Sequence, residues 1–117
     1  MPETDEAMPS VFWFSNLKAG ADAAAYERWV QHTDYRLAAG VECVEHYRVH
    51  RIAGPVEGDG GPHYDYIEVL QVTDIDEYRA ALKESPAIQH IIAEIGQFVD
   101  GVGSAWGMPI APLGKER

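Results

Sequence analysis

"VECVEHYRVHRIAGPVEGDGGPHYDYIEVLQVT", residues 41–73, decides how this chain folds. Both ends of the stretch, residues 41–52 and 63–73, alternate β-branched or aromatic residues with polar ones, which predicts two strands. The segment between them, residues 53–62, consists mainly of glycine, proline and acidic residues and predicts a turn. The stretch therefore predicts a long β-hairpin at the centre of the sequence.

A strand and a helix are predicted on the N-terminal side of this hairpin. Residues 11–18 are aromatic and β-branched at their start and predict a strand. Asp22 is a suitable N-cap for a helix that Gly40 ends. One face of that helix is apolar at helical spacing: Tyr26, Trp29, Val30, Thr33 and Leu37.

Two helical segments and a weaker strand are predicted on the C-terminal side. Asp74 caps a short helical stretch, and Ser85 with Pro86 begins a second, stronger helix. The apolar stripe of this second helix contains six residues: Ile88, Ile91, Ile92, Ile95, Phe98 and Val99. Residues 104–110 are a weaker strand candidate, because Pro109 cannot donate a hydrogen bond to a ladder.

The predicted order is β-α-β-β-α-β, that of a ferredoxin-like α+β sandwich with both helices on one face of four antiparallel strands. We expect residues 1–10 to be a loose tail, residues 11–113 the single domain, and residues 114–117 a C-terminal tail. The strand at 63–73 points apolar side chains to both sides, although one side lacks a helix. We therefore expect a second copy to cover that sheet face, which gives a homodimer.

The composition excludes several classes of partner. The formal net charge is −10, from 19 acidic and 9 basic residues among 117, which repels nucleic acid. No apolar run approaches the roughly 20 residues that span a membrane. The single cysteine, Cys43, and the lack of an export signal predict a cytoplasmic protein.

Short motifs across residues 11–110 resemble the RedY-like (HapK-like) family of the dimeric α/β-barrel superfamily. They are "LKAG", "YERWV" followed by "DY", "YRVHRI", "YDYIEV", "DIDEYRAAL" and "SPA", in this order. The resemblance implies a dimeric α/β barrel, a role in prodiginine-type or related secondary-metabolite pathways, and no bound metal or organic cofactor. It also implies a small-molecule role, namely ring closure or condensation of a pathway intermediate. The wider superfamily includes polyketide cyclases and cofactor-free monooxygenases.

Three residues are candidates for acid-base catalysis: His32, Asp34 and Glu68. Glu68 lies within a strand, on the same side as Tyr66, where burial would raise its pKa and make it a general base. Helical spacing places Asp34 at about 80° and His32 at about 120° from the apolar stripe. The alternatives are a solvated helix face for the first two and a cross-strand pair with Arg48 for Glu68.

Five further residues are candidates for substrate binding: Tyr66, His46, His50, Trp13 and Tyr35. Tyr66 or His46 would donate a hydrogen bond to a carbonyl oxygen of the substrate. His46 and His50 share one face of their strand but lie about 13 Å apart, too far to hold one metal ion. Tyr35 belongs to the "DY" pair, although helical spacing places it opposite the apolar stripe. We expect no metal site.

The preferred interpretation is a cofactor-free cyclase or condensation enzyme that acts on an aromatic or polyketide-like intermediate. A cofactor-free monooxygenase and a non-catalytic carrier of the same intermediate remain as alternatives, because fold alone does not choose among them.

Overall fold

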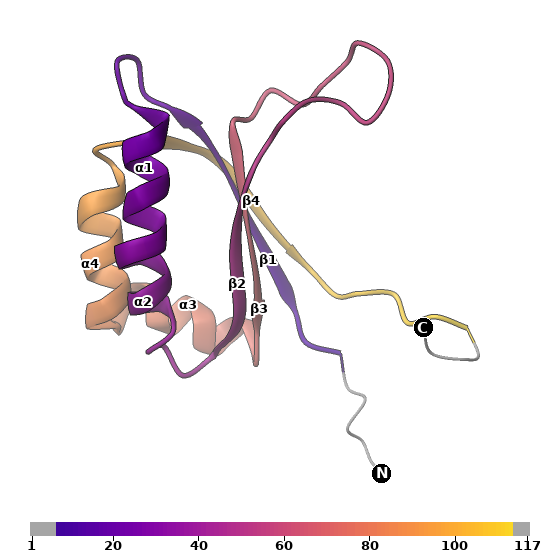
Figure 1. Ribbon diagram of the computed structural model, residues 1–117. Helices are drawn as coiled ribbons and strands as arrows, with labels where there is room; N and C mark the ends of the chain where they lie inside the picture. The colour runs from indigo at the N-terminus through magenta and orange to yellow at the C-terminus, as the bar shows by residue number, and fades with distance from the viewer. Residues whose placement is uncertain (1–6, 114–117) are drawn as a thin grey trace.

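The four strands form one antiparallel sheet in the order β2-β3-β1-β4, in a computed structural model that describes residues 7–113. The strands are β1 (Ser10–Leu17), β2 (Val44–Arg51), β3 (Tyr66–Val72) and β4 (Val99–Gly107). β2 and β3 pair as the predicted hairpin, and β1 pairs with both β3 and β4. All helices lie on one side of the sheet (Figure 1). The predicted ferredoxin-like α+β arrangement is confirmed.

The first helical region is continuous but irregular. It consists of α1 (Ala23–Trp29), a π-helical turn η1 (Val30–Asp34) and α2 (Tyr35–Ala38). The second region is divided, as predicted, into α3 (Ile75–Glu84) and α4 (Pro86–Ile95). A side chain caps the N-terminus of each of α1, α3 and α4: Asp22, Asp74 and Ser85. No helix among residues 7–113 is both long and apolar enough to cross a membrane.

The last strand begins earlier than predicted. α4 ends at Ile95, so Phe98 and Val99 leave the helical stripe, and Val99 pairs with Leu17 as the first residue of β4. The Phe98 carbonyl accepts a hydrogen bond from the Lys18 backbone N–H at 2.9 Å, which holds this crossover against β1. Pro109 lies beyond the strand, as its missing N–H requires.

The first strand begins inside the stretch that was predicted as the N-terminal tail, residues 1–10. β1 already includes Ser10, and the Pro9 carbonyl accepts a hydrogen bond from the Val72 backbone N–H. Most of that tail, residues 1–6, and the predicted C-terminal tail at 114–117 lie outside the described residues.

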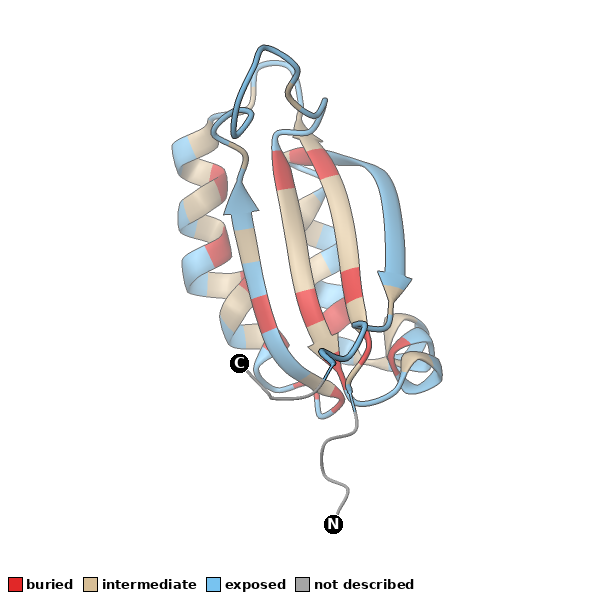
Figure 2. Ribbon diagram, turned by 90° about the vertical axis from the view of Figure 1, so that its right-hand side faces the viewer, coloured by how far each residue is buried: buried red, intermediate tan, exposed pale blue. Residues whose placement is uncertain are grey.

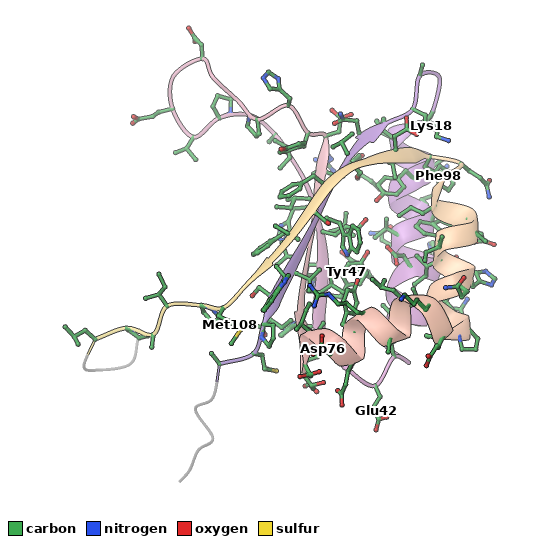
Figure 3. All side chains as sticks on the ribbon, turned by 180° about the vertical axis from the view of Figure 1, so that it is seen from behind. Lys18, Glu42, Tyr47, Asp76, Phe98 and Met108 are labelled. Carbon is green, nitrogen blue, oxygen red and sulfur yellow. The ribbon has the colours of Figure 1, made fainter. Side chains whose placement is uncertain are left out.

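The helices cover one face of the sheet and leave the other face without a helix. Figure 2 looks onto the face that no helix covers. Central side chains on this face are partly buried and apolar, among them Phe12, paired with Val69, and Phe14, paired with Ile67. On the opposite face, side chains fill the space between sheet and helices, with Tyr47 among them (Figure 3). This second layer contains the cavity described next.

Candidate functional site

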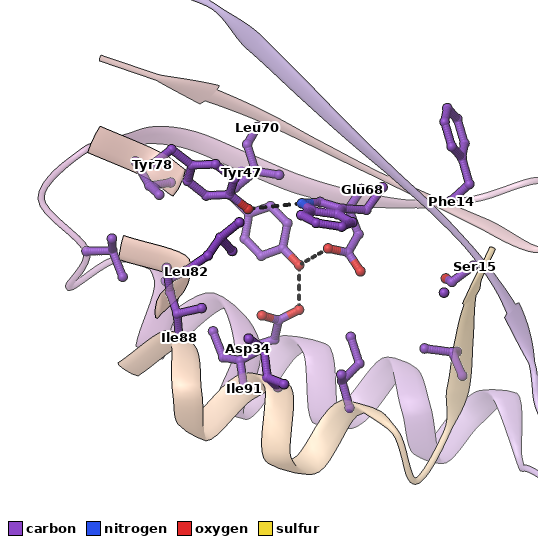
Figure 4. Close-up of a pocket in the computed structure, with 18 residues that line it drawn as sticks. Phe14, Ser15, Asp34, Tyr47, Glu68, Leu70, Tyr78, Leu82, Ile88 and Ile91 are labelled. Carbon is purple, nitrogen blue, oxygen red and sulfur yellow. Dashed lines mark hydrogen bonds between the residues drawn. The ribbon is translucent and has the colours of Figure 1, made fainter. Parts of the chain in front are cut away.

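A cavity of about 300 Å³ lies between the sheet and the helices (Figure 4). Most of its wall is apolar and comes from β1, β3, α3 and α4, among them Leu70, Leu82, Ile88 and Ile91. Only Ile92 and Gly101 of its lining residues are exposed to solvent, so the cavity opens between α4 and β4. The polar lining residues are few: Trp13, Ser15, Asp34, Tyr47, Glu68 and Tyr78. None of the described lining residues is lysine, arginine or histidine.

The π-helical turn places Asp34 in this cavity. The Tyr35 backbone N–H donates to the Val30 carbonyl, five residues back, so the helix holds one extra residue in this turn. One residue corresponds to about 100° of rotation. The extra residue therefore moves Asp34 from the border of the apolar stripe into its centre, and the side chain is fully buried.

Asp34 and Glu68 are joined through the hydroxyl group of Tyr47. The Tyr47 hydroxyl donates to Asp34 Oδ2 at 2.6 Å and also reaches Glu68 Oε1 at 3.2 Å. A phenol has one hydrogen to donate. The longer contact is therefore a full hydrogen bond only when Glu68 carries a proton and donates it to the Tyr47 oxygen. Asp34 Oδ1, the second oxygen of that carboxylate, is buried without a hydrogen-bond partner among residues 7–113.

Burial changes how this group titrates. It raises the pKa of Glu68 to about 7, aided by the negative charge of Asp34 and opposed by the contact with Tyr47. It also raises the pKa of Asp34 to about 6, against the lowering effect of the Tyr47 hydrogen bond. Burial and the nearby Glu68 and Asp34 carboxylates raise the pKa of Tyr47 well above its ordinary value. Near neutral pH, the two carboxyl groups therefore share about one proton as a coupled pair.

A second hydrogen-bonded pair lies beside this group. The Trp13 indole Nε1–H donates to the Tyr78 hydroxyl oxygen at 3.0 Å, and both residues line the cavity. Trp13 is the cross-strand partner of Glu68 in the β1–β3 register. Side chains at such paired positions stand about 5 Å apart on the same face. The two hydrogen-bonded groups are therefore neighbours on the same wall of the cavity.

The structure brings three of the eight predicted site residues into the cavity: Asp34, Glu68 and Trp13. Tyr66 is buried on the same face of the sheet as Glu68, but it does not line the cavity. Its hydroxyl group donates to Glu27 Oε2 at 2.7 Å. Tyr35 accepts a hydrogen bond from the Val49 backbone N–H at 3.0 Å and also lies outside the lining.

The three predicted histidines do not line the cavity, which corrects the sequence-based placement. His32 is exposed, because the turn that brings Asp34 inward leaves His32 on the outer side of the helix. His46 and His50 are exposed because Tyr47 faces the helices, and alternate residues of a strand face opposite ways. Within the described part of the chain, no three His, Cys, Asp or Glu residues are grouped so that they could hold a metal ion.

Sequence reasoning missed Tyr47 and Tyr78. The signal for Tyr47 was present, since it alternates with the polar His46 and Arg48 and shares its strand face with Val49. Tyr78 lies on the apolar face of α3, at helical spacing from Ile75 and Leu82, so its burial was readable from the sequence. Its contact with Trp13 was not, because it depends on how α3 packs against the sheet.

Fold and site together define a ferredoxin-like α+β protein with a largely apolar cavity that contains a carboxylate-phenol-carboxylate group. The family model described as REDY-like protein HapK matches residues 9–110. The chain belongs to this family.

Solved structures share the fold over most of their length. HapK from Hahella chejuensis is 24% identical, with a TM-score of 0.70 over 94% of this chain and 97% of that one. SnoaB, described as a cofactor-independent oxygenase from Streptomyces nogalater, is 14% identical, with a TM-score of 0.68 over 94% and 100%. A dimeric ferredoxin-like protein of unknown function from Thermobifida fusca is 17% identical, with a TM-score of 0.67 over 89% and 93%. Among curated proteins, none matches the sequence significantly.

Proposed function

We propose that this protein is an acid-base enzyme of secondary metabolism that forms a carbon-carbon bond within an aromatic or polyketide-like intermediate, by ring closure or condensation and without a bound cofactor. The observation that carries the proposal is the Asp34–Tyr47–Glu68 group, which is held in an otherwise apolar cavity of about 300 Å³. Cavities of this size suit a ligand of two or three rings. Membership of the REDY-like family supports the metabolic setting.

Asp34 is the base in this proposal. Its Oδ2 accepts the Tyr47 hydrogen bond, which leaves Oδ1 without a partner in the described chain. Oδ1 removes a proton from a carbon beside a carbonyl group of the substrate. The electron pair of that C–H bond then forms the new bond to a second carbonyl carbon, and the π electrons of that carbonyl move to its oxygen.

Glu68 is the acid. It carries a proton near neutral pH because burial raises its pKa to about 7, and it gives this proton to the oxygen of the second carbonyl. Asp34 then holds a proton and Glu68 holds none. After the product leaves, rotation of the Asp34 carboxyl group brings its protonated oxygen to Tyr47. The Tyr47 oxygen accepts that proton and the Tyr47 hydrogen passes to Glu68, which restores the starting state. Substrate and product are at the same oxidation level, so the step requires no oxidant or reductant.

We propose a cytoplasmic homodimer formed through the face of the sheet that no helix covers. That face has partly buried apolar side chains from both central strands, such as Phe12 and Val69. Apolar surface of this kind favours association with an identical face about a two-fold axis. The similar fold of the dimeric protein from Thermobifida fusca supports this arrangement.

An oxygenase is the second candidate. A carbanion made by Asp34 could react with molecular oxygen instead of a carbonyl carbon, and a largely apolar cavity would admit oxygen. The similar fold of SnoaB, a cofactor-independent oxygenase, favours this candidate. Oxygen uptake, measured with an electrode during turnover of the pathway intermediate, separates the two. Uptake of one molecule per turnover supports the oxygenase, and turnover without uptake supports ring closure or condensation.

The proton-removal step can be tested without knowing the natural substrate. 2-Tetralone is an uncharged bicyclic ketone with an acidic carbon between its ring and its carbonyl group. Purified protein in D₂O should accelerate deuterium exchange at that carbon, followed by NMR. Asp34→Asn should lower the rate by at least about a hundredfold, the usual contribution of a positioned base.

Two matched variants complete this experiment. Glu84→Gln changes an exposed carboxylate on α3 and should exchange at the wild-type rate. Asp34→Asn should still bind 2-tetralone, measured by calorimetry, because the cavity wall is unchanged. Wild-type protein that binds the ketone but catalyses no exchange would instead indicate a carrier.

A further inference from the structure

Trp13 determines which way the hydroxyl hydrogen of Tyr78 points. An indole N–H can donate a hydrogen bond but cannot accept one. In the 3.0 Å contact between them, the Tyr78 oxygen is therefore the acceptor. The hydrogen of the Tyr78 hydroxyl group must point away from Trp13 and toward another acceptor.

The described chain offers no such acceptor. Tyr78 is 6% exposed, so its hydroxyl group is largely removed from bulk water. No residue between 7 and 113 accepts a hydrogen bond from it, although buried hydroxyl groups normally have an acceptor. Its neighbours in the core are mainly apolar, including Val72 and Ile88. Tyr78 lines the cavity, where its side chain stands beside Trp13 (Figure 4), so a ligand in the cavity is the acceptor within reach.

We propose that Tyr78 binds the carbonyl oxygen of the substrate, with Trp13 as the residue that positions its hydroxyl group, and that the substrate is an uncharged carbonyl compound. This inference rests on the proposed function, in which Asp34 removes a proton from the carbon beside that carbonyl. Tyr78 thereby takes the role that the sequence suggested for Tyr66 or His46. Tyr66 donates to Glu27, and His46 lies on the other face of the sheet.

The arrangement of the two hydrogen-bonded groups supports this assignment. Because Trp13 and Glu68 are cross-strand partners, the Trp13–Tyr78 pair stands next to the acid-base group. If the substrate's carbonyl oxygen is bound to Tyr78, the carbon next to that carbonyl lies toward the carboxyl groups of Asp34 and Glu68. As that carbon loses its proton, negative charge develops on the oxygen, where a fixed hydroxyl donor stabilises it.

The charge of the cavity supports the second half of the proposal. Its two carboxyl groups, Asp34 and Glu68, have no cationic neighbour among the described lining residues. A substrate carboxylate or phosphate would add a further negative charge in a largely apolar space, which is costly. Burial raises the pKa of Tyr78 to about 12, so this donor remains neutral and protonated at working pH.

The test measures the carbonyl group of a bound probe directly. The probe is 2-tetralone labelled with ¹³C at the carbonyl carbon, and its stretching band is recorded by isotope-edited infrared spectroscopy. A hydrogen bond lowers the frequency of this band. Bound to wild-type protein, the band should therefore lie at lower frequency than when bound to Tyr78→Phe. Trp13→Phe, which keeps a ring but loses the orienting N–H, should give a broader band between the two.

Affinity provides a second measurement that a purely structural role would not reproduce. Tyr78→Phe should weaken 2-tetralone binding about three- to tenfold, the effect of one lost hydrogen bond. Binding of tetralin, the hydrocarbon of the same shape, should not change. Tyr64→Phe removes an exposed phenol that packs against Phe14 and is the matched control.

Three results would overturn the proposal. Identical bands in wild type and Tyr78→Phe would show that Tyr78 does not bind the oxygen. Equal losses for 2-tetralone and tetralin would show that Tyr78 only maintains the cavity. Tighter binding of 2-naphthoate than of 2-tetralone would exclude an uncharged substrate. Failure of the proposed function is distinguishable, since exchange that persists in Asp34→Asn would exclude the base while leaving the Tyr78 band shift intact.

Discussion

Tyr47 donates its hydroxyl hydrogen to Asp34 across 2.6 Å, a buried contact that links the first helical region to β2. The contact holds the carboxylate by one oxygen, Oδ2, and the other oxygen, Oδ1, has no hydrogen-bond partner among residues 7–113. It also separates the two carboxyl groups, since Tyr47 lies between Asp34 and Glu68. The chemistry proposed for the cavity depends on this contact.

Removing the Tyr47 hydroxyl should therefore change the pH dependence of proton exchange. A hydrogen bond to the charged form lowers the pKa of Asp34, so Tyr47→Phe should raise that pKa by about one unit. The rate of 2-tetralone exchange increases as Asp34 ionises, and its midpoint should move to higher pH by the same amount. Rates measured from pH 5 to 9 give the midpoint. An unmoved midpoint would show that Tyr47 does not bond to the ionised carboxylate.

Glu68 should make the fold less stable as pH rises. Its pKa is raised from 4.5 to about 7 in the folded state, so between these values the folded chain holds a proton that the unfolded chain has released. The free energy of unfolding therefore falls with increasing pH across this range. Glu68→Gln removes the titrating group. The free energy of unfolding of this variant, relative to that of wild type, should therefore be higher at pH 8 than at pH 4 by about 1–3 kcal/mol.

Urea denaturation at fixed protein concentration, at both pH values, measures this gain. Glu84→Gln, an exposed change of the same kind, should follow the wild-type profile. Parallel profiles for Glu68→Gln and wild type would mean that Glu68 titrates as it does in water.

The extra residue of the π-helical turn should be dispensable. Deleting the exposed His32 would restore an ordinary turn between Val30 and Asp34 and leave every later residue on its present side of the helix. We expect the variant to keep its circular dichroism spectrum and to exchange 2-tetralone within about threefold of wild type, a difference of less than about 1 kcal/mol. A folded variant without exchange would mean that the widened turn itself aims the carboxylate.

A charge on the uncovered face of the sheet should separate the proposed dimer. Phe12 lies on that face in the central strand β1, and both of its cross-strand partners, Val69 and Ala105, are apolar, so an aspartate there would be buried without a partner in the dimer. Phe12→Asp should therefore sediment as a monomer at concentrations where wild type is a dimer. Ala24→Asp, on an exposed part of α1, should remain dimeric. A monomeric wild type at micromolar concentration would contradict the proposed assembly.

The fold followed from local patterns, whereas the site did not. Alternation in residues 41–73 and the capping residues Asp74 and Ser85 were sufficient for the element order, because each depends on near neighbours in the chain. Strand alternation also put Glu68 on the same face as Tyr66, but it left open whether that face looks toward the helices. The last strand was predicted too late in the sequence, because the apolar residues Phe98 and Val99 fit the end of a helix and the start of a strand equally well.

Errors at the site came from assuming a regular helix. At a uniform rotation per residue, Asp34 only borders the apolar stripe and His32 lies about 40° further from it. The widened turn moves Asp34 into the stripe and leaves His32 outside. Long-range contacts were also beyond local patterns. The pair formed by Trp13 and Tyr78 joins residues 65 positions apart, and no spacing rule connects them.

The widened turn also affects how relatives should be aligned. A homologue with a regular helix would carry its equivalent of Asp34 only three positions after its equivalent of Val30, instead of four. An alignment without a gap in this helix would match that acidic residue to Thr33 and report the proposed base as missing. Searches for the equivalent of Asp34 should therefore permit a one-residue insertion or deletion between these two positions.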